Sequence, residues 1–152
     1  MYSYFRSKVE LRDAILERWL LKYSNALDSI TKKDGSAKDI LYDWFFLLFN
    51  LKKNELFEKE EMFTLNTSLI QQNTRVTQKH EDRLINQLET IIKREILNKT
   101  IREQDSFLLA RTLFGLMSAF YHPAFSDQWR DENINDKFSK SWEIVSRGLF
   151  QL

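Results

Sequence analysis

His80 stands beside two acidic residues, and this is the first group in the chain whose residue types could do chemistry. His80, Glu81 and Asp82 are consecutive, and imidazole together with carboxylates can bind a metal ion or move a proton. Neighbouring residues of a helix point to different faces, so these three do not converge on one ion and we predict no metal site. His80 shares the apolar side of its helix with Val76 and Leu84. Two interpretations follow: a partly buried histidine with one satisfied nitrogen, or a polar anchor in a ligand cavity.

The rest of the sequence contains no recognisable catalytic motif. It has no cysteine for thiolate chemistry or a zinc framework, no glycine-rich phosphate loop, no HExxH motif and no serine between elbow glycines. The sequence therefore predicts no catalytic residues, no cofactor and no enzymatic activity.

Large apolar side chains form the second group of candidate functional residues. The run Trp44–Phe49 is apolar on every side of a helix and is either ordinary core or part of a cavity wall. Small-molecule sites are lined in this way, with a few polar groups that orient the ligand. A closed cavity for a small, largely hydrophobic ligand would draw on Trp19, Tyr23, Trp44, Phe45, Phe49, Met62, Phe63, Asn66, Asn73, His80, Leu84, Leu113 and Met117.

The composition indicates an all-α domain that must position these residues. Only three glycines and one proline occur in 152 residues, so turns are few, and 43% hydrophobic content excludes a disordered chain. A formal net charge of +1 gives no overall field that attracts nucleic acid. The N-terminus has no apolar signal-peptide core and no apolar run reaches membrane-span length. We expect a cytoplasmic protein with no membrane partner.

Hydrophobic periodicity and capping residues predict six helices. Ser7, Ser36 and Asp105 have the form of N-caps, and Pro123 disfavours helical geometry at the preceding residue. The charged run from Lys52 to Glu61 is predicted as a solvated loop followed by a first helical turn. The predicted helices cover about 8–30, 37–54, 62–70, 76–98, 106–122 and 136–150.

The segment 107–125 is apolar around its whole circumference, with Arg111 as its only charge. Such a helix must be covered on all sides, and the few helices of one chain are not expected to achieve this. We predict a two-fold symmetric homodimer through the last two long helices, with an interface formed by Leu109, Leu113, Leu116, Phe120, Phe138, Trp142, Val145 and Leu149.

The N-terminal segment resembles one part of the tetracycline-repressor (TetR) family. Its residues YSYFRSKVEL are similar to the pattern LYxHFxSKxxL at the end of that family's recognition helix, with Phe5, Ser7, Lys8 and Leu11 matching. Tyr4 stands where His is common. Asp105-Ser106, the FYHPAF segment and Gly148-Leu149 are also similar to one branch of these domains, whereas Lys99-Thr100-Ile101 replaces a frequent Gly-Glu-Phe turn.

The resemblance implies residues 1–7 as a remnant of a helix-turn-helix head and 8–152 as an effector-binding and dimerisation domain. Tyr2, Tyr4 and Lys8 would contact DNA phosphates only with an intact head, so this chain is not expected to bind DNA specifically. The function implied is that of the regulatory part of a TetR-like repressor that responds to a small apolar effector. The alternative is a helical protein–protein interaction module without a small-molecule ligand.

Overall fold

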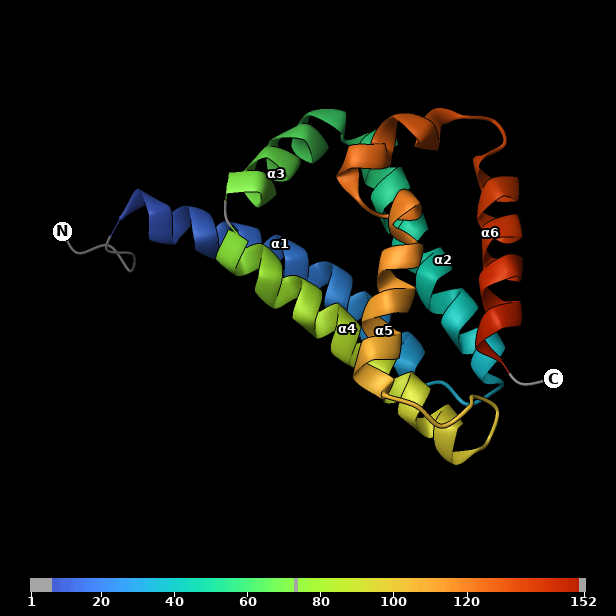
Figure 1. Cartoon of the computed structure of the whole chain (residues 1–152). Helices are drawn as coiled ribbons and strands as arrows, with labels where there is room; N and C mark the ends of the chain where they lie inside the picture. Colours follow the sequence, from blue (N-terminus) through green and yellow to red (C-terminus); the bar gives the residue numbers. More distant parts are fainter. Residues whose placement is uncertain (1–6, 73, 151–152) are drawn as a thin grey trace.

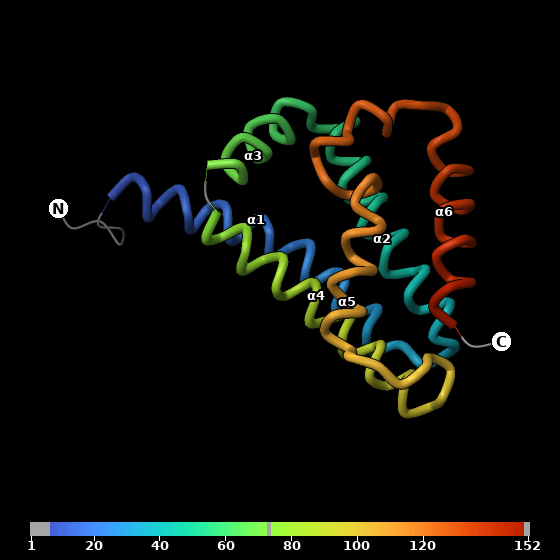
Figure 2. The backbone as a smooth tube through the Cα atoms, viewed as in Figure 1, coloured from blue at the N-terminus to red at the C-terminus, as the bar shows by residue number. Residues whose placement is uncertain are grey.

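Two long helices, α1 (Lys8–Thr31) and α4 (Thr74–Leu97), lie side by side along one edge of the molecule, and the first turns of α1 project beyond the other helices (Figures 1 and 2). The computed structural model describes residues 7–72 and 74–150, which are almost entirely helical. The prediction of an all-α fold is confirmed. The remaining elements are α2 (Ala37–Glu58), α3 (Glu60–Gln72), α5 (Ser106–Leu116), the 3-10 helices η1 (Ser118–Phe120) and η2 (Pro123–Arg130), and α6 (Ile134–Leu149).

The predicted N-caps are present at three helices. Ser7 Oγ accepts a hydrogen bond from the Glu10 amide at 3.2 Å, and Ser36 Oγ accepts one from the Asp39 amide at 3.3 Å. At the start of α5, Asp105 accepts from the Leu108 amide at 3.0 Å. Each side chain satisfies a first-turn N–H group that has no partner within its own helix.

The C-terminus of α4 is closed by a residue in left-handed backbone geometry. Lys99 has a φ of 63°, and its amide donates to the Ile96 carbonyl at 3.1 Å. The next amide, that of Thr100, donates to the Glu95 carbonyl at 3.0 Å. This pair of bonds is the Schellman motif, whose left-handed position is normally a glycine. Lys99 therefore occupies the position of the glycine in the Gly-Glu-Phe turn that is frequent in similar TetR domains.

The prediction of a solvated loop at Lys52–Glu61 is wrong over most of its length. α2 continues to Glu58 and α3 begins at Glu60, so only Lys59 separates the two helices. The reason is that the apolar stripe of α2 continues beneath the charged residues. Lys52 and Leu56 lie one and two turns after Leu48, and all three are buried.

The helix predicted over 106–122 ends at Leu116, well before Pro123. The Met117 amide bonds to the carbonyls of both Leu113 and Phe114 at 3.3 Å, which begins the change to the tighter 3-10 pattern. Side chains then take the carbonyls at this end: the Tyr121 hydroxyl donates to Phe114 O at 2.9 Å, and Trp129 Nε1 donates to Ala119 O at 2.9 Å. The chain then turns back, and the segment 118–130 covers the helices beneath it.

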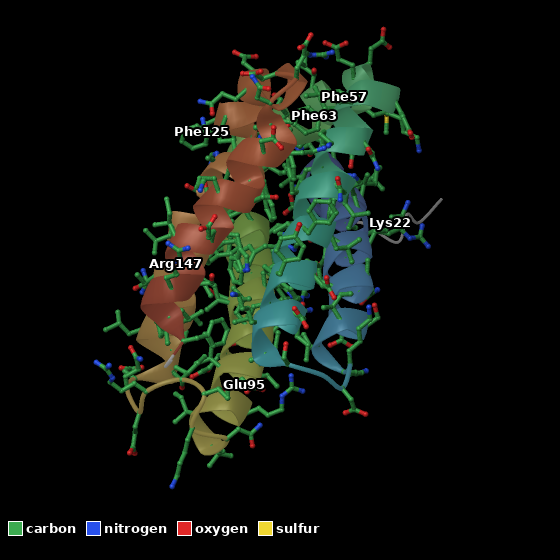
Figure 3. The ribbon with its side chains drawn as sticks, turned by 90° about the vertical axis from the view of Figure 1, so that its right-hand side faces the viewer. Lys22, Phe57, Phe63, Glu95, Phe125 and Arg147 are labelled. Carbon is green, nitrogen blue, oxygen red and sulfur yellow. The ribbon has the colours of Figure 1, made fainter. Side chains whose placement is uncertain are left out.

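The core is built around the aromatic face of α2, and α6 covers that face. Phe138 is stacked on Phe49 at 5.3 Å between ring centroids and meets Tyr42 and Phe46 edge-on. Trp142 contacts Phe45 at 5.8 Å. At the end of the domain that contains Phe57 and Phe63, η2 contributes Trp129 against Phe63 at 5.8 Å, whereas Glu95 lies near the opposite end (Figure 3).

This packing corrects the argument for the dimer interface. The expectation that one chain cannot cover these faces is wrong for five of the eight residues named, because α2 and the 118–130 segment bury them. Leu109 and Val145 are partly buried, and Leu116 is 63% exposed. The residues buried within the chain itself are Leu113, Phe120, Phe138, Trp142 and Leu149.

A helix that crosses a bilayer needs about 20 predominantly apolar residues. Over residues 7–72 and 74–150 no helix combines that length with sufficient hydrophobicity.

Candidate functional site

A cavity of about 70 Å³ lies where helices α1 to α5 meet, beneath the turn that joins η1 to η2. A second hollow of about 290 Å³ shares five of its lining residues and extends between α3 and α4. The shared residues Ile70, Thr77, Glu81, His122 and Pro123 therefore form the mouth of the inner cavity. The inner wall consists of Leu20, Leu48, Lys52, His80, Leu84, Phe114 and Tyr121.

Lys52 supplies a buried cation to this wall. Its Nζ lies 4.3 Å from the ring centroid of Tyr23 and 5.2 Å from that of Trp19, both on α1. Aromatic faces attract a cation at these distances. Burial lowers the pKa of Lys52 to about 8, while the nearby Glu55 carboxylate acts in the opposite direction. The ammonium is therefore still protonated at neutral pH.

Tyr23 connects α1 to α2 at the same place. Its hydroxyl donates a hydrogen bond to Glu55 Oε2, and its ring contacts Lys52 and, edge-on, the His80 imidazole at 6.4 Å. Burial raises the pKa of Tyr23 well above its usual value, and the hydrogen bond to Glu55 adds to this effect. The phenol therefore stays neutral and remains a donor.

His80 is buried and neutral. Burial lowers its pKa to about 3, and the positive charges of Lys52 and Arg83 contribute further. Its Nδ1 is buried and has no hydrogen-bond partner among the described residues. A buried polar atom without a partner costs free energy, and this one belongs to a residue that lines the cavity.

The cover of the cavity is formed by the residues that follow α5. Tyr121 is stacked on Phe114 at 4.4 Å between ring centroids. His122 Nδ1 accepts a hydrogen bond from the Ala124 amide at 3.1 Å and so starts η2. Burial raises the pKa of Tyr121, with a smaller contribution from the charge of Glu81. The mouth thus combines aromatic surface with one carboxylate.

The model of the family described as "Tetracyclin repressor-like, C-terminal domain" matches residues 37–142, which covers α2 to α5, the 3-10 segment and the first half of α6. The chain belongs to this family. No curated protein sequence matches it significantly.

Membership in the tetracyclin repressor-like family confirms the resemblance seen in the sequence and places the cavity in a regulatory, effector-binding and dimerisation domain. The matched region contributes all lining residues of the inner cavity except Leu20 on α1. Within the described ranges 7–72 and 74–150, no three His, Asp or Glu side chains gather as metal ligands.

The structure brings four of the predicted ligand residues of this tetracyclin repressor-like domain to the cavity or directly behind it. His80 and Leu84 line it, and Trp19 and Tyr23 hold Lys52. The expectation that Met62 faces an enclosed space is wrong, because this residue is 52% exposed. Asn73 lies outside the described residues. The remaining predicted residues are buried in the core without lining the inner cavity: Trp44, Phe45, Phe49, Phe63, Asn66, Leu113 and Met117.

Lys52 is the functional candidate that the sequence analysis missed, because a charged run was interpreted as solvated surface. The signal was present in the spacing. Leu48, Lys52 and Leu56 are four residues apart and so share one helix face, and the flanking leucines indicate that this face is buried.

Proposed function

We propose that this domain is the effector-binding and dimerisation part of a TetR-like transcriptional repressor in the cytoplasm, and that the cavity beneath Tyr121 is its effector site. The observation that carries the proposal is a cavity between five helices whose lining includes the buried lysine Lys52 and His80 with its unpartnered buried nitrogen. Structural cores seldom leave such groups next to empty space. The proposed effector is small and largely apolar, since most of the inner wall is Leu, Phe and Tyr.

Effector binding would act on α1. In the TetR family, which the N-terminal segment resembles, this helix links the domain to a DNA-binding head. Trp19 and Tyr23 of α1 contact Lys52, and Glu17 of α1 pairs with Lys79 and Arg83 of α4 at 3.0 Å. A ligand that touches Lys52 and α4 favours one of two positions of α1 by its differential affinity for them. We do not propose that the effector-binding and dimerisation domain itself recognises an operator.

The dimer that we propose uses the outward faces of α5 and α6. Leu108 and Leu116 are 62% and 63% exposed and lie on one stripe of α5, while Ile144 of α6 is 63% exposed. A methyl group added at Gly115 would meet no atom within 4 Å inside the chain, so packing within the chain does not require glycine there. Close approach of a second α5 would require it, and a two-fold bundle of these helices would cover the exposed leucines.

A ligand screen followed by thermal unfolding tests the effector site. A molecule present at a hundred times its dissociation constant should stabilise the domain by ~2.7 kcal/mol. The variant Leu84→Phe, which fills the cavity, should remove this stabilisation, while Leu97→Phe on an exposed helix end should keep it. Binding that survives Leu84→Phe would place the ligand elsewhere. A domain that binds only a protein partner, with no small molecule competing, would support the interaction-module alternative.

A further inference from the structure

The charge distribution around the cavity bears on the chemical class of the ligand, given the effector site proposed above. Lys52 is 6% exposed and is one of the residues that line the inner cavity. Its ammonium contacts two ring faces but forms no ion pair with a carboxylate of the described residues. The Glu55 carboxylate, whose charge raises the pKa of Lys52, accepts a hydrogen bond from the Tyr23 hydroxyl. A buried cation whose direct contacts are ring faces, and whose nearby carboxylate is already bonded to Tyr23, is incompletely compensated.

We propose that the cavity binds a small monocarboxylic acid, whose carboxylate pairs with Lys52 Nζ and whose apolar body lies against Leu20, Leu48, Leu84 and Phe114. An ammonium–carboxylate pair in a water-poor site is stronger than a neutral hydrogen bond. His80 stands beside Lys52 in the same wall, and its unpartnered Nδ1 offers a second polar contact to the carboxylate when that nitrogen carries the proton.

The other charged groups at the site decide the orientation of the acid. Glu81 lies at the mouth, since it lines both the inner cavity and the outer hollow, whereas Lys52 lines only the inner cavity. Arg83 is engaged with Glu17 at 3.0 Å. An anion is therefore repelled at the mouth and attracted at the inner end, so the carboxylate enters first and the apolar body faces Glu81. A phosphate dianion does not fit this arrangement, because the site holds one cation and a carboxylate at its entrance.

The size of the cavity restricts the acid further. The inner space of about 70 Å³ is well below the roughly 300 Å³ at which drug-sized ligand sites begin. The ligand is therefore short, or it extends through the mouth into the outer hollow.

Paired probes test this inference on the full chain. Butanoate, hexanoate and benzoate are each compared with butan-1-ol, hexan-1-ol and benzyl alcohol by NMR titration near neutral pH and at matched ionic strength. At least one acid should bind on the order of tenfold more tightly than its alcohol. The preference should disappear in Lys52→Met and increase in Glu81→Gln. Lys53→Met is the matched control, because Lys53 is the next residue of α2 and donates instead to Asn135 at 3.1 Å.

A measurement on the unsubstituted chain covers the case in which Lys52→Met fails to fold. The pKa of Lys52, followed through its side-chain carbon signal, should rise from about 8 when the acid binds, because a neighbouring carboxylate favours the ammonium form. Equal binding of acids and alcohols, a preference that survives Lys52→Met, or an unchanged Lys52 pKa would overturn the inference and leave the effector site intact. Failure of every probe to bind would overturn both the inference and the proposed effector site.

Discussion

Trp44 on α2 donates a hydrogen bond from its indole Nε1 to Oε1 of Gln87 on α4, at 3.0 Å. The amide nitrogen of the same glutamine donates to the backbone carbonyl of Ser24 on α1 at 2.9 Å. One side chain therefore joins three helices around the fully buried Trp44. These helices also form three walls of the cavity, so this bridge fixes their spacing close to the candidate site.

Replacing Gln87 should destabilise the domain beyond the loss of packing. Gln87→Met keeps the approximate volume but leaves the Trp44 N–H buried without an acceptor, which should cost ~1–3 kcal/mol. Urea unfolding measures the loss. Asn86→Ala on the exposed side of the same helix should have little effect, and equal midpoints for the two variants would contradict the bridging role of Gln87.

Stability should fall on mild acidification because of His80. Its pKa is about 3 in the folded chain against an ordinary 6.5, so between these values the unfolded chain binds the proton first. The free energy of unfolding should therefore fall as pH falls below 6.5, by up to ~1.4 kcal/mol per pH unit. Between roughly pH 5 and the ordinary histidine pKa of 6.5 most carboxylates remain ionised. Urea unfolding in this pH range therefore isolates the contribution of His80. His80→Gln should flatten the slope, whereas His122→Gln at an exposed position should not.

Lys99→Gly should stabilise the domain. Lys99 has a left-handed φ of 63°, a conformation that costs a residue with a side chain ~1–2 kcal/mol and glycine almost nothing. The greater freedom of glycine in the unfolded chain offsets part of the gain. We expect a net increase of ~0.5–1 kcal/mol in the free energy of unfolding. Lys99→Ala is the control and should give no gain; a glycine variant no more stable than the alanine variant would count against this account.

Leu116 and Trp142, which the sequence predicts together in the dimer interface, should respond differently to a charged substitution. Leu116→Asp lies on the exposed stripe of α5 and should convert a dimer to folded monomers in sedimentation experiments, as should Ile144→Asp. Trp142→Asp introduces a carboxylate among buried aromatic rings and should unfold the chain instead. Leu97→Asp, at an 83% exposed position, should change neither property. An unsubstituted chain that sediments as a monomer at micromolar concentration would contradict the proposed dimer.

Local patterns in the sequence were sufficient to predict an all-α fold and the starting points of α1, α2 and α5. The last helix was predicted to begin at Asp136 but begins at Ile134, and the two 3-10 helices were not predicted. Ser7, Ser36 and Asp105 cap the expected helices, because capping depends on residues only three positions apart. The end of α5 was predicted too late, because it depends on hydrogen bonds from Tyr121 and Trp129, and no local pattern reveals where these side chains return.

The candidate site was predicted only in part for a similar reason. His80 and Leu84 follow from helical spacing, but the pairing of Lys52 with rings on α1 is a contact between separate helices. The run of charges around Lys52 predicted a solvent-exposed segment, whereas the long aliphatic stem of Lys52 allows this residue to occupy a buried face. Likewise, the aromatic run of α2 was recognised as buried, but not that α6 of the same chain is the element that covers it.

The cover over the cavity also has a consequence for how quickly a ligand can enter and leave. Between Ser118 and Arg130 the backbone forms two 3-10 helices, whose hydrogen bonds are of poorer geometry than those of an α-helix. Segments of this kind open locally at a lower free energy than the helical core beneath them. We expect the opening of this segment, and not diffusion of the ligand to the surface, to limit the association rate. The same opening step should then limit amide hydrogen exchange in this segment and exchange of the ligand.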